Sequence, residues 1–318
     1  MKTLGGRQIF PLALAAGLLF VTGPAWAIDW AGVQGKDIVV FYPGQASWEW
    51  VLTETDHSGA PKFRGGKNCV NCHEDEQKRI GDLIVSGKKL EPTPIPNKPG
   101  SLAVNVKAAH DDQKLYIRLE WAGAATPSGK KMDADFESKA TVMIDDGVVA
   151  EMTRAGCWGA CHDDAESMAS APAGKEITKY LAGSRSKLTR QGGGDNIKPQ
   201  ADLDAALQGG KFLEYWQARL NKGKPAVAVD GYILDKRHKN DTPAITAEGE
   251  FTGDKWVVVL SRPLKAAGPG HKDIAPGKVY TLGFAIHDDY TEHRFHHVSL
   301  ATTMVLDSGT AELVAVKK

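Results

Sequence analysis

The chain has 318 residues, and its 39 lysine and arginine residues balance its 39 aspartate and glutamate residues, so the formal net charge at pH 7 is zero. This balance provides no overall field for binding nucleic acid or an anionic membrane, and any docking surface must be a local patch. Beyond an N-terminal leader, about 290 residues remain, enough for one large domain or two modest ones.

The first 27 residues have the pattern of a secretory signal peptide. Two basic residues, Lys2 and Arg7, precede the apolar run 9–21, and residues 25–27 form the small-x-small pattern that signal peptidase cleaves. The apolar run has 13 residues, whereas a membrane-spanning helix needs about 20. We therefore expect a periplasmic protein that is cleaved near residue 27 and has no stable membrane span.

The segment 28–100 is interrupted by many proline and glycine residues and contains one helical pattern, at 69–86, where apolar residues recur at helical spacing. The proline-rich run 91–100 cannot be helical and is typical of an extended connector. We expect an N-terminal haem module over residues 28–100, with a domain boundary near residue 100.

The first chemical motif is CVNCH, in which two cysteines on one helical turn are followed directly by a histidine. Cys69 and Cys72 can reach the two vinyl groups of one porphyrin, and His73 can bind the iron from below. A thioredoxin-like redox pair has the same cysteine spacing, but it needs a β-α-β context that does not surround Cys69. The motif therefore predicts covalent haem attachment with His73 as the proximal iron ligand.

The second motif, CWGACH, begins at Cys157 and has three residues between its cysteines instead of two. Small residues, Gly159 and Ala160, would allow the extra residue to bulge outward. A local disulfide, a bridge to the first motif and a metal site are the alternatives, although zinc needs about four ligands and this motif supplies three. The repeated cysteine–histidine order favours a second haem c, bound covalently by Cys157 and Cys161 with His162 as its proximal ligand.

Short alternating apolar segments follow residue 100, and turn residues separate them. This pattern is typical of antiparallel strands, so we expect a mainly β fold class, with a β-sandwich over residues 101–318. A stretch with few strand signals, at about 151–221, is expected to be a helical insertion that carries the second motif and contains a helix at 212–220. The expected strands cover residues 102–108, 114–121, 140–145, 244–251, 255–261, 280–287, 296–306 and 311–316.

A haem iron in an electron carrier usually has a second axial ligand, and ten histidines are available. For the first haem the candidate is His57, which lies 12 residues before Cys69 and close to Trp48 and Trp50. A surface-loop histidine is an equally open interpretation of His57.

For the second haem we expect His296 as the distal ligand, with His297 as the runner-up. In an extended strand His296 would share the face of Val298 and Met304, and His297 would lie on the other face. A lone polar residue on an apolar face can instead be a hydrogen-bonded core histidine. Met168 and Met304 compete as thioether ligands, which would raise the reduction potential.

Three strand segments carry a resemblance to a known family. They are LYIRLEW at 115–121, WVVVLSRPL at 256–264 and YTLGFAIHD at 280–288, followed by the HVSL strand. Together they resemble the haem-binding domain of ethylbenzene dehydrogenase and dimethylsulfide dehydrogenase γ subunits, also called the cytochrome c-552/DMSO reductase-like haem-binding domain. The resemblance covers roughly residues 100 to 318 and rests on strand patterns.

The resemblance implies a β-sandwich that holds one haem and exchanges electrons with a molybdenum enzyme. In the γ subunits the haem is not covalently bound, and its axial ligands are a methionine and a lysine, the lysine lying near the start of the strand that here begins at His296. This chain has histidines at that place and a Cys-x3-Cys-His insertion in the methionine region. Its N-terminal segment looks like the extra haem module of dihaem relatives.

The motifs together predict a periplasmic dihaem c-type cytochrome with no catalytic residue of its own. Its partners would be a redox donor, such as a quinol-oxidising cytochrome, and an acceptor, such as a molybdenum oxidoreductase. The alternative is a haem enzyme of the peroxidase or nitrogen-oxide reductase type, in which one iron keeps an open position. A haem-based sensor would need an output domain, and none is visible in the sequence.

Overall fold

The structure, a computed structural model, describes residues 28–44, 48–91, 94–124, 133–160, 180–188, 196–289 and 296–318. The expected signal peptide at residues 1–27 lies outside these ranges. So do Cys161, His162 and Met168.

Strands dominate the described part of the chain, and the expected mainly β class is confirmed. Neighbouring strands are antiparallel except where β13 pairs with β12 and with β2. The strands are β1 (Lys36–Phe41), β2 (Ser101–His110), β3 (Lys114–Ala122), β4 (Ser138–Asp145), β5 (Leu213–Leu220), β6 (Val227–Ile233), β7 (Arg237–Lys239), β8 (Thr246–Thr252), β9 (Lys255–Pro263), β10 (Tyr280–His287), β11 (His297–Val298), β12 (Thr302–Leu306) and β13 (Leu313–Lys317).

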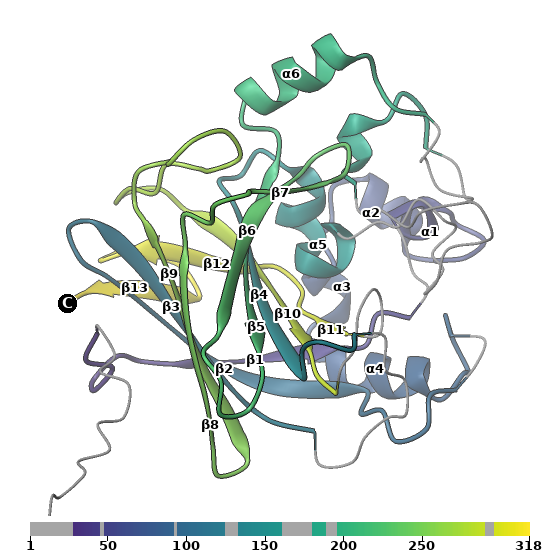
Figure 1. Cartoon of the computed structure of the whole chain (residues 1–318). Helices are drawn as coiled ribbons and strands as arrows, with labels where there is room; N and C mark the ends of the chain where they lie inside the picture. Colours follow the sequence, from purple (N-terminus) through teal and green to yellow (C-terminus); the bar gives the residue numbers. More distant parts are fainter. Residues whose placement is uncertain are drawn as a thin grey trace, which may run out of the picture.

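The strands follow one another in a single sheet that folds over on itself (Figure 1). The order along the sheet is β7-β6-β5-β4-β10-β11-β1-β2-β3-β9-β8, and β12 and β13 connect β10 to β2. The two ends approach each other, because β5 and β6 both contact β8. Apolar side chains from both halves, such as Ile117, Trp216 and Phe284, fill the space between them without solvent exposure. This sandwich-like core is the rigid support for the rest of the molecule.

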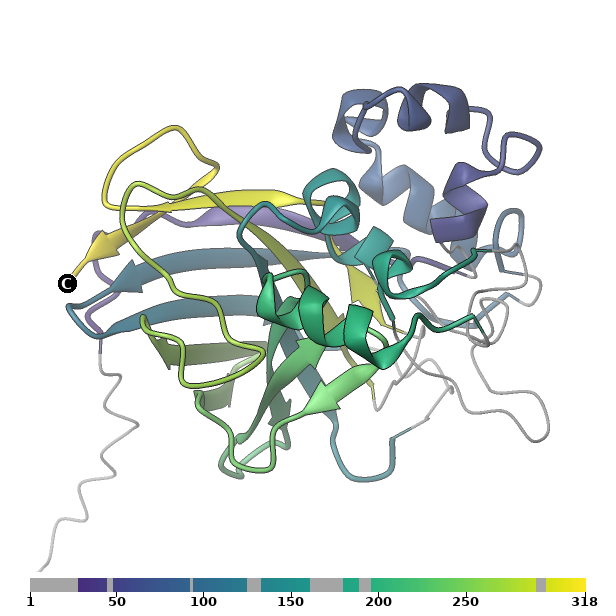
Figure 2. The same cartoon turned by 90° about the horizontal axis from the view of Figure 1, so that it is seen from above.

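The helices gather beside one end of the sheet (Figure 2). Within the described ranges, none of them combines the length and the apolar character that crossing a membrane would require. The helices are α1 (Trp48–Leu52), α2 (Ala60–Arg64), α3 (Val70–His73), α4 (Gln77–Val85), α5 (Ala150–Ala160) and α6 (Gln200–Gln208), with a short 3-10 helix at Ala182–Ser184.

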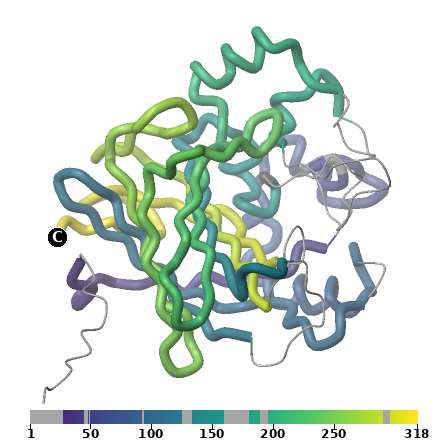
Figure 3. The backbone as a smooth tube through the Cα atoms, in the orientation of Figure 1, coloured from purple at the N-terminus to yellow at the C-terminus, as the bar shows by residue number. Residues whose placement is uncertain are grey.

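Helix α5 lies between the sheet and α1, as the trace in Figure 3 shows. It contacts β4 and β10 on one side and α1 on the other. The helical pattern expected at 69–86 is present, but it is divided into α3 and α4. Asp75 causes the division, because its φ of 55° lies in the left-handed region and turns the chain between the two helices.

Two expectations about the sheet are wrong. The helix expected at 212–220 is strand β5, which pairs with β4 and β6. Six consecutive residues of β5, starting at Leu213, are buried, so the alternation that normally identifies a strand is absent. The expected strand 296–306 is divided into β11 and β12.

Strand β1 was missed because it lies in a segment that we expected to be irregular. It pairs with β2 along its full length and touches β11 at Phe41. The N-terminal segment therefore contributes a strand to the sheet that follows it. The domain boundary near residue 100 stays a prediction.

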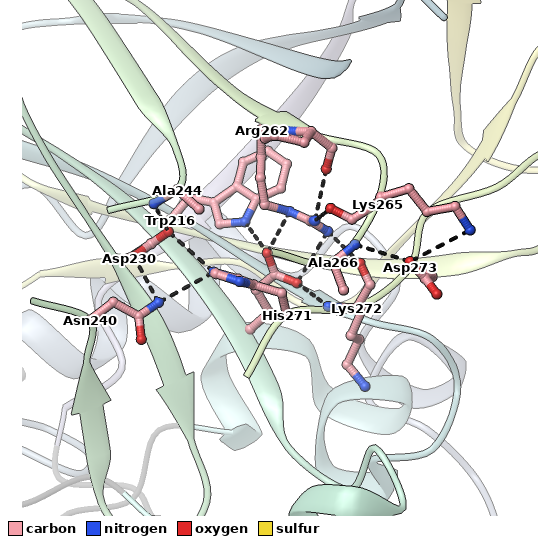
Figure 4. Close-up of polar contacts among 12 residues, drawn as sticks. Trp216, Asp230, Asn240, Ala244, Arg262, Lys265, Ala266, His271, Lys272 and Asp273 are labelled. Atoms are coloured by element: carbon pink, nitrogen blue, oxygen red, sulfur yellow. Dashed lines mark hydrogen bonds and ion pairs between the residues drawn. The ribbon is translucent and has the colours of Figure 1, made fainter. Parts of the chain in front are cut away.

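A buried ion pair ties β5 to β9 and to the loop after β9 (Figure 4). The guanidinium Nε of Arg262 is 2.7 Å from Oε1 of Glu214, and both side chains are 0 % exposed. Glu214 also accepts hydrogen bonds from the indole of Trp216 and the backbone N–H of Lys272. Burial nevertheless raises the pKa of Glu214, and Arg262 opposes that rise. The carboxylate therefore depends on its cation for stability.

Replacing Arg262 with leucine should lower the free energy of unfolding by about 3–5 kcal/mol, because the buried Glu214 carboxylate would lose its cation. Chemical denaturation of the whole protein measures this change. Lys255→Met is the matched control, since Lys255 pairs with Glu120 at the surface and should contribute less than about 1 kcal/mol.

The Arg262→Leu destabilisation should also depend on pH. Without Arg262 the folded-state pKa of Glu214 rises further above its ordinary value of 4.5, so the folded protein holds a proton that the unfolded chain releases. The loss should be small near pH 4.5 and grow as pH rises toward the folded-state pKa. A loss that does not change between pH 5 and pH 7 would contradict the role given to Glu214.

Candidate haem sites

A cavity of about 310 Å³ lies among α1, α2, α3 and α4, and four of the predicted haem residues line it together: His57, Cys69, Cys72 and His73. We call it the CVNCH cavity. Its volume is within the range of cavities that bind cofactors. Much of its remaining wall is apolar or aromatic and includes Phe41, Trp50, Phe63, Ile80, Leu83 and Trp158.

Local hydrogen bonds explain why the two cysteines stand on one turn. The side-chain oxygens of Asn68 and Asn71 accept each other's backbone N–H groups, at 2.9 and 3.1 Å. The backbone N–H groups of Cys72 and His73 both donate to the carbonyl oxygen of Cys69. The single turn of α3 therefore presents both thiols and the imidazole to the cavity.

The thiols do not resemble a redox pair. Burial raises the pKa of the Cys69 thiol to about 12, so this thiol is protonated at neutral pH. A thioredoxin-like cysteine needs a lowered pKa and a reactive thiolate. Cys72 is exposed, and neither cysteine is in a disulfide in the described chain.

The rings of His57 and His73 approach each other at the cavity. Their centroids are 6.3 Å apart, with an angle of 35° between the ring planes. A metal–nitrogen bond of about 2 Å places the centroids of two imidazoles on one metal roughly 6 Å apart. The Nδ1 atoms are already engaged, by the carbonyl oxygen of Val51 at 3.0 Å and by Oε2 of Glu76 at 2.8 Å. Each ring therefore keeps Nε2 for a ligand.

These residues fit a haem c. Cys69 and Cys72 would hold it through thioether bonds, and His73 and His57 would be the axial ligands. The fit rests on two imidazoles at metal-sharing distance, two thiols on one turn and an apolar wall. His57 lies in the loop between α1 and α2 and is half-buried; it lines the cavity, and its ring lies 5.2 Å from that of Trp50. Its role as the distal ligand stays a prediction.

Arg154 of α5 anchors the CVNCH cavity to the rest of the protein. The backbone N–H of Cys69 donates to the carbonyl oxygen of Arg154 at 2.9 Å. The Arg154 guanidinium donates to the carbonyl oxygens of Phe63 and Lys67 and lies 3.9 Å from the centroid of the Phe63 ring. The sequence pattern did not single out this arginine.

The two cysteine motifs meet at Trp158. This residue belongs to the spacer of the second motif, yet its side chain lines the CVNCH cavity. Its backbone N–H donates to the carbonyl oxygen of Ser299 at 3.1 Å, which fixes it against the chain between β11 and β12. Because Cys157 directly precedes Trp158, the Cα atom of the first residue of the second motif lies about 3.8 Å from that of a residue in the wall of the first site.

Cys157 is fully buried on the outer face of the sheet, in a cluster with Met143, Ala285 and Val298 that we call the outer cluster. Two glycines allow α5 to come this close. Gly156 has a φ of 65°, and a Cβ there would lie 2.2 Å from the backbone of Leu300. A Cβ at Gly283 would lie 2.7 Å from the backbone nitrogen of Cys157. A larger residue at Gly283 would push α5 away from β10, and one at Gly156 would push α5 away from the chain at Leu300.

His296 lies on the same side of the sheet as Cys157. It is 2 % exposed, and its ring stacks on that of His287 with centroids 4.3 Å apart and planes 11° from parallel. His287 follows Gly283 and Ala285 by strand alternation, so it faces outward with them. His287 was missed in the sequence, although its parity in β10 could have indicated it.

The parity argument for His296 is wrong in part. Val298 belongs to the outer cluster, as expected for its side, but Met304 packs in the core between the two halves of the sheet. The break between β11 and β12 resets the alternation. The competing ligand Met304 therefore does not pack in the cluster that contains Cys157.

The runner-up His297 has a different environment. Its Nε2–H donates to the carbonyl oxygen of Pro99 at 2.7 Å, and its ring meets the edge of Tyr42 at 6.5 Å between centroids. Burial and the nearby charge of Lys98 lower the pKa of His297 to about 3, so its ring is neutral. Its contacts join β11 to the connector before β2. Cys161, His162 and Met168, the other residues predicted for this second site, lie outside the described ranges.

Known proteins resemble this chain over most of its length. The family model described as ethylbenzene dehydrogenase matches residues 83–299, more than half of the chain. Cytochrome c-552 of Stutzerimonas stutzeri is 36% identical over 317 residues, 98% of this chain and 99% of its own length. Cytochrome c-551 of Rhodocyclus tenuis is 28% identical over 296 residues, 92% of this chain and 100% of its own length.

Solved structures show only a weak likeness. A carbohydrate binding module of family 9 from Caldicellulosiruptor kristjanssonii, in complex with cellotriose, is 8% identical with a TM-score of 0.30, over 63% of this chain and 65% of that one. A putative carbohydrate-binding protein from Bacteroides uniformis has a TM-score of 0.32 at 8% identity, over 70% and 83% of the two chains. The family model covers more than half of the chain, and a cytochrome is 36% identical over nearly its full length. This chain therefore belongs to the ethylbenzene dehydrogenase family, among relatives that are cytochrome-like haem proteins.

Proposed function

We propose that this chain is a periplasmic dihaem c-type cytochrome that carries single electrons between a respiratory donor and a terminal oxidoreductase. The observation that carries the proposal is the approach of His57 and His73 at the cavity that Cys69 and Cys72 line. A bound haem iron would supply the one-electron couple between its ferric and ferrous states.

Two histidines at one site favour electron transfer over catalysis. An iron with imidazole on both sides has no open position for a substrate, whereas a haem enzyme keeps one. The hydrogen bonds to Val51 and Glu76 hold both rings in orientation, so little movement would accompany a change of oxidation state. Pre-organised ligands of this kind suit a carrier.

The relation between the two motifs supports a relay. Trp158 lies in the spacer of the second motif and in the wall of the CVNCH cavity, so a group attached at Cys157 would be held close to the first site. The exposure of Cys72 leaves one edge of that site at the surface, where a partner protein could exchange an electron. A molybdenum enzyme as that partner rests on the family resemblance alone.

The number of covalent haems is tested by mass. The denatured wild-type protein, expressed with a cytochrome maturation system, should retain two porphyrins in mass spectrometry. Replacing Cys69 and Cys72 together with alanine should remove one of them, because both thioether bonds of the first site would be lost. A wild-type protein that retains a single porphyrin would remove Cys157 and Cys161 from the proposal.

The distal ligand of the first haem is tested by its spin state. His57→Ala should convert one low-spin haem to high spin and allow it to bind carbon monoxide, because the sixth position would open. Absorption and EPR spectra measure the change. His238→Ala is the control, since His238 pairs with Asp235 on another part of the molecule and should leave both haems low-spin. Carbon monoxide binding by the wild type would instead favour a haem enzyme.

The second haem is tested by the stacked pair. His296→Ala should change its low-spin EPR signal if His296 is the distal ligand, and His287→Ala should then perturb that signal without removing it, because His287 supports the ring by stacking at 4.3 Å. The reverse pattern would transfer the ligand role to His287. Unchanged signals in both variants would exclude both residues.

A further inference from the structure

The two imidazoles of the CVNCH cavity donate to different kinds of acceptor. With Nε2 directed to a ligand, Nδ1 of each ring carries the proton. Nδ1–H of His57 donates to the carbonyl oxygen of Val51, a neutral peptide group, at 3.0 Å. Nδ1–H of His73 donates to the carboxylate of Glu76 at 2.8 Å. The ring of His73 therefore experiences a full negative charge where the ring of His57 experiences only a dipole.

The Glu76 carboxylate is held at both oxygens. Oε2 accepts from His73, and Oε1 accepts from the guanidinium of Arg79 at 2.8 Å. The left-handed turn at Asp75 sets Glu76 at the start of α4, from which its side chain reaches back to α3. One donor on each carboxylate oxygen therefore fixes Glu76 beside His73.

A carboxylate acceptor changes what the imidazole does at its other nitrogen. It draws the Nδ1 proton toward itself, which makes Nε2 a stronger electron donor. A stronger donor stabilises the oxidised state of a bound iron more than the reduced state and so lowers the reduction potential. A peptide carbonyl, as at His57, does this less.

We propose that Glu76 is a positioning residue for His73 that lowers the reduction potential of the haem held by Cys69 and Cys72. Arg79 completes the arrangement by holding the carboxylate in place. This inference rests on the proposed function, because it requires a haem with His73 as a ligand. No change in covalent attachment is involved, and the one-electron couple stays the same.

Glu76→Gln in the full holoprotein tests the inference by spectroelectrochemical titration. The potential of the affected haem should rise by at least the equivalent of a tenfold change in its reduction equilibrium, about 59 mV for one electron. The haem whose spectrum responds to His57→Ala identifies the relevant couple. Covalent haem content should stay unchanged, while the EPR g-values of that haem shift as the acceptor becomes neutral.

Two further variants separate the hydrogen bond from its charge. Glu74→Gln removes the same charge two residues away, from an exposed side chain, and should move the potential much less. Arg79→Gln keeps the carboxylate and removes the cation that partly neutralises it, so it should lower the potential of the same haem, opposite to the effect of Glu76→Gln. If the Glu76→Gln protein does not incorporate haem, the potential of the Arg79→Gln protein still tests the role of the carboxylate.

The outcomes distinguish the inference from the proposed function. A retained haem whose potential is unchanged in Glu76→Gln overturns the role of Glu76 and leaves the cytochrome proposal intact. Equal shifts in Glu76→Gln and Glu74→Gln would reduce the effect to general electrostatics and also overturn it. A wild-type protein without covalent haem at Cys69 and Cys72 would overturn the proposed function itself.

Discussion

The close approach of α5 to β10 is the contact on which the arrangement of both cysteine motifs depends. It is possible because Gly283 of β10 has no side chain where the backbone of Cys157 approaches it, and Gly156 has none where α5 meets the chain at Leu300, between β11 and β12. Residues of α5 contribute to the surroundings of both cysteine motifs. Cys157 enters the outer cluster against the sheet, and the carbonyl oxygen of Arg154 accepts from Cys69 on the other side of the helix.

The sheet and the helices have different tasks. The sandwich is held by a continuous apolar core and by the buried pair of Arg262 and Glu214, which joins β9 to β5. The short helices α1 to α4 bury few apolar residues each, so isolated helices of this length would not be stable. These helices keep a fixed structure because they pack against β1 and α5. A bound porphyrin would add apolar contacts where the core formed by the helices is small.

The two imidazoles at the CVNCH cavity differ in their hydrogen-bond acceptors. His57 and His73 are the same side chain, yet one donates to a peptide carbonyl and the other to a carboxylate. The carboxylate is held by an arginine one helical turn further along α4. Under the proposed function, this asymmetry would let the protein adjust the electron affinity of one site without changing its ligands. Trp158 connects that site to the beginning of the second motif.

The sequence by itself determined the fold class and was enough to predict covalent haem attachment, because strand alternation, cysteine spacing and an adjacent histidine are local properties. It also placed His57 near the first motif, only 12 residues away along the chain. Strand β5 was missed since burial on both faces removes alternation, and Trp158 was missed since it lines the site of the other motif. His287 was missed although its stacking partner His296 is only nine residues further along the chain. Only the tertiary structure decided that the rings of His57 and His73 lie 6.3 Å apart at one cavity and that Trp158 is part of its wall, because these contacts depend on how the helices pack against one another.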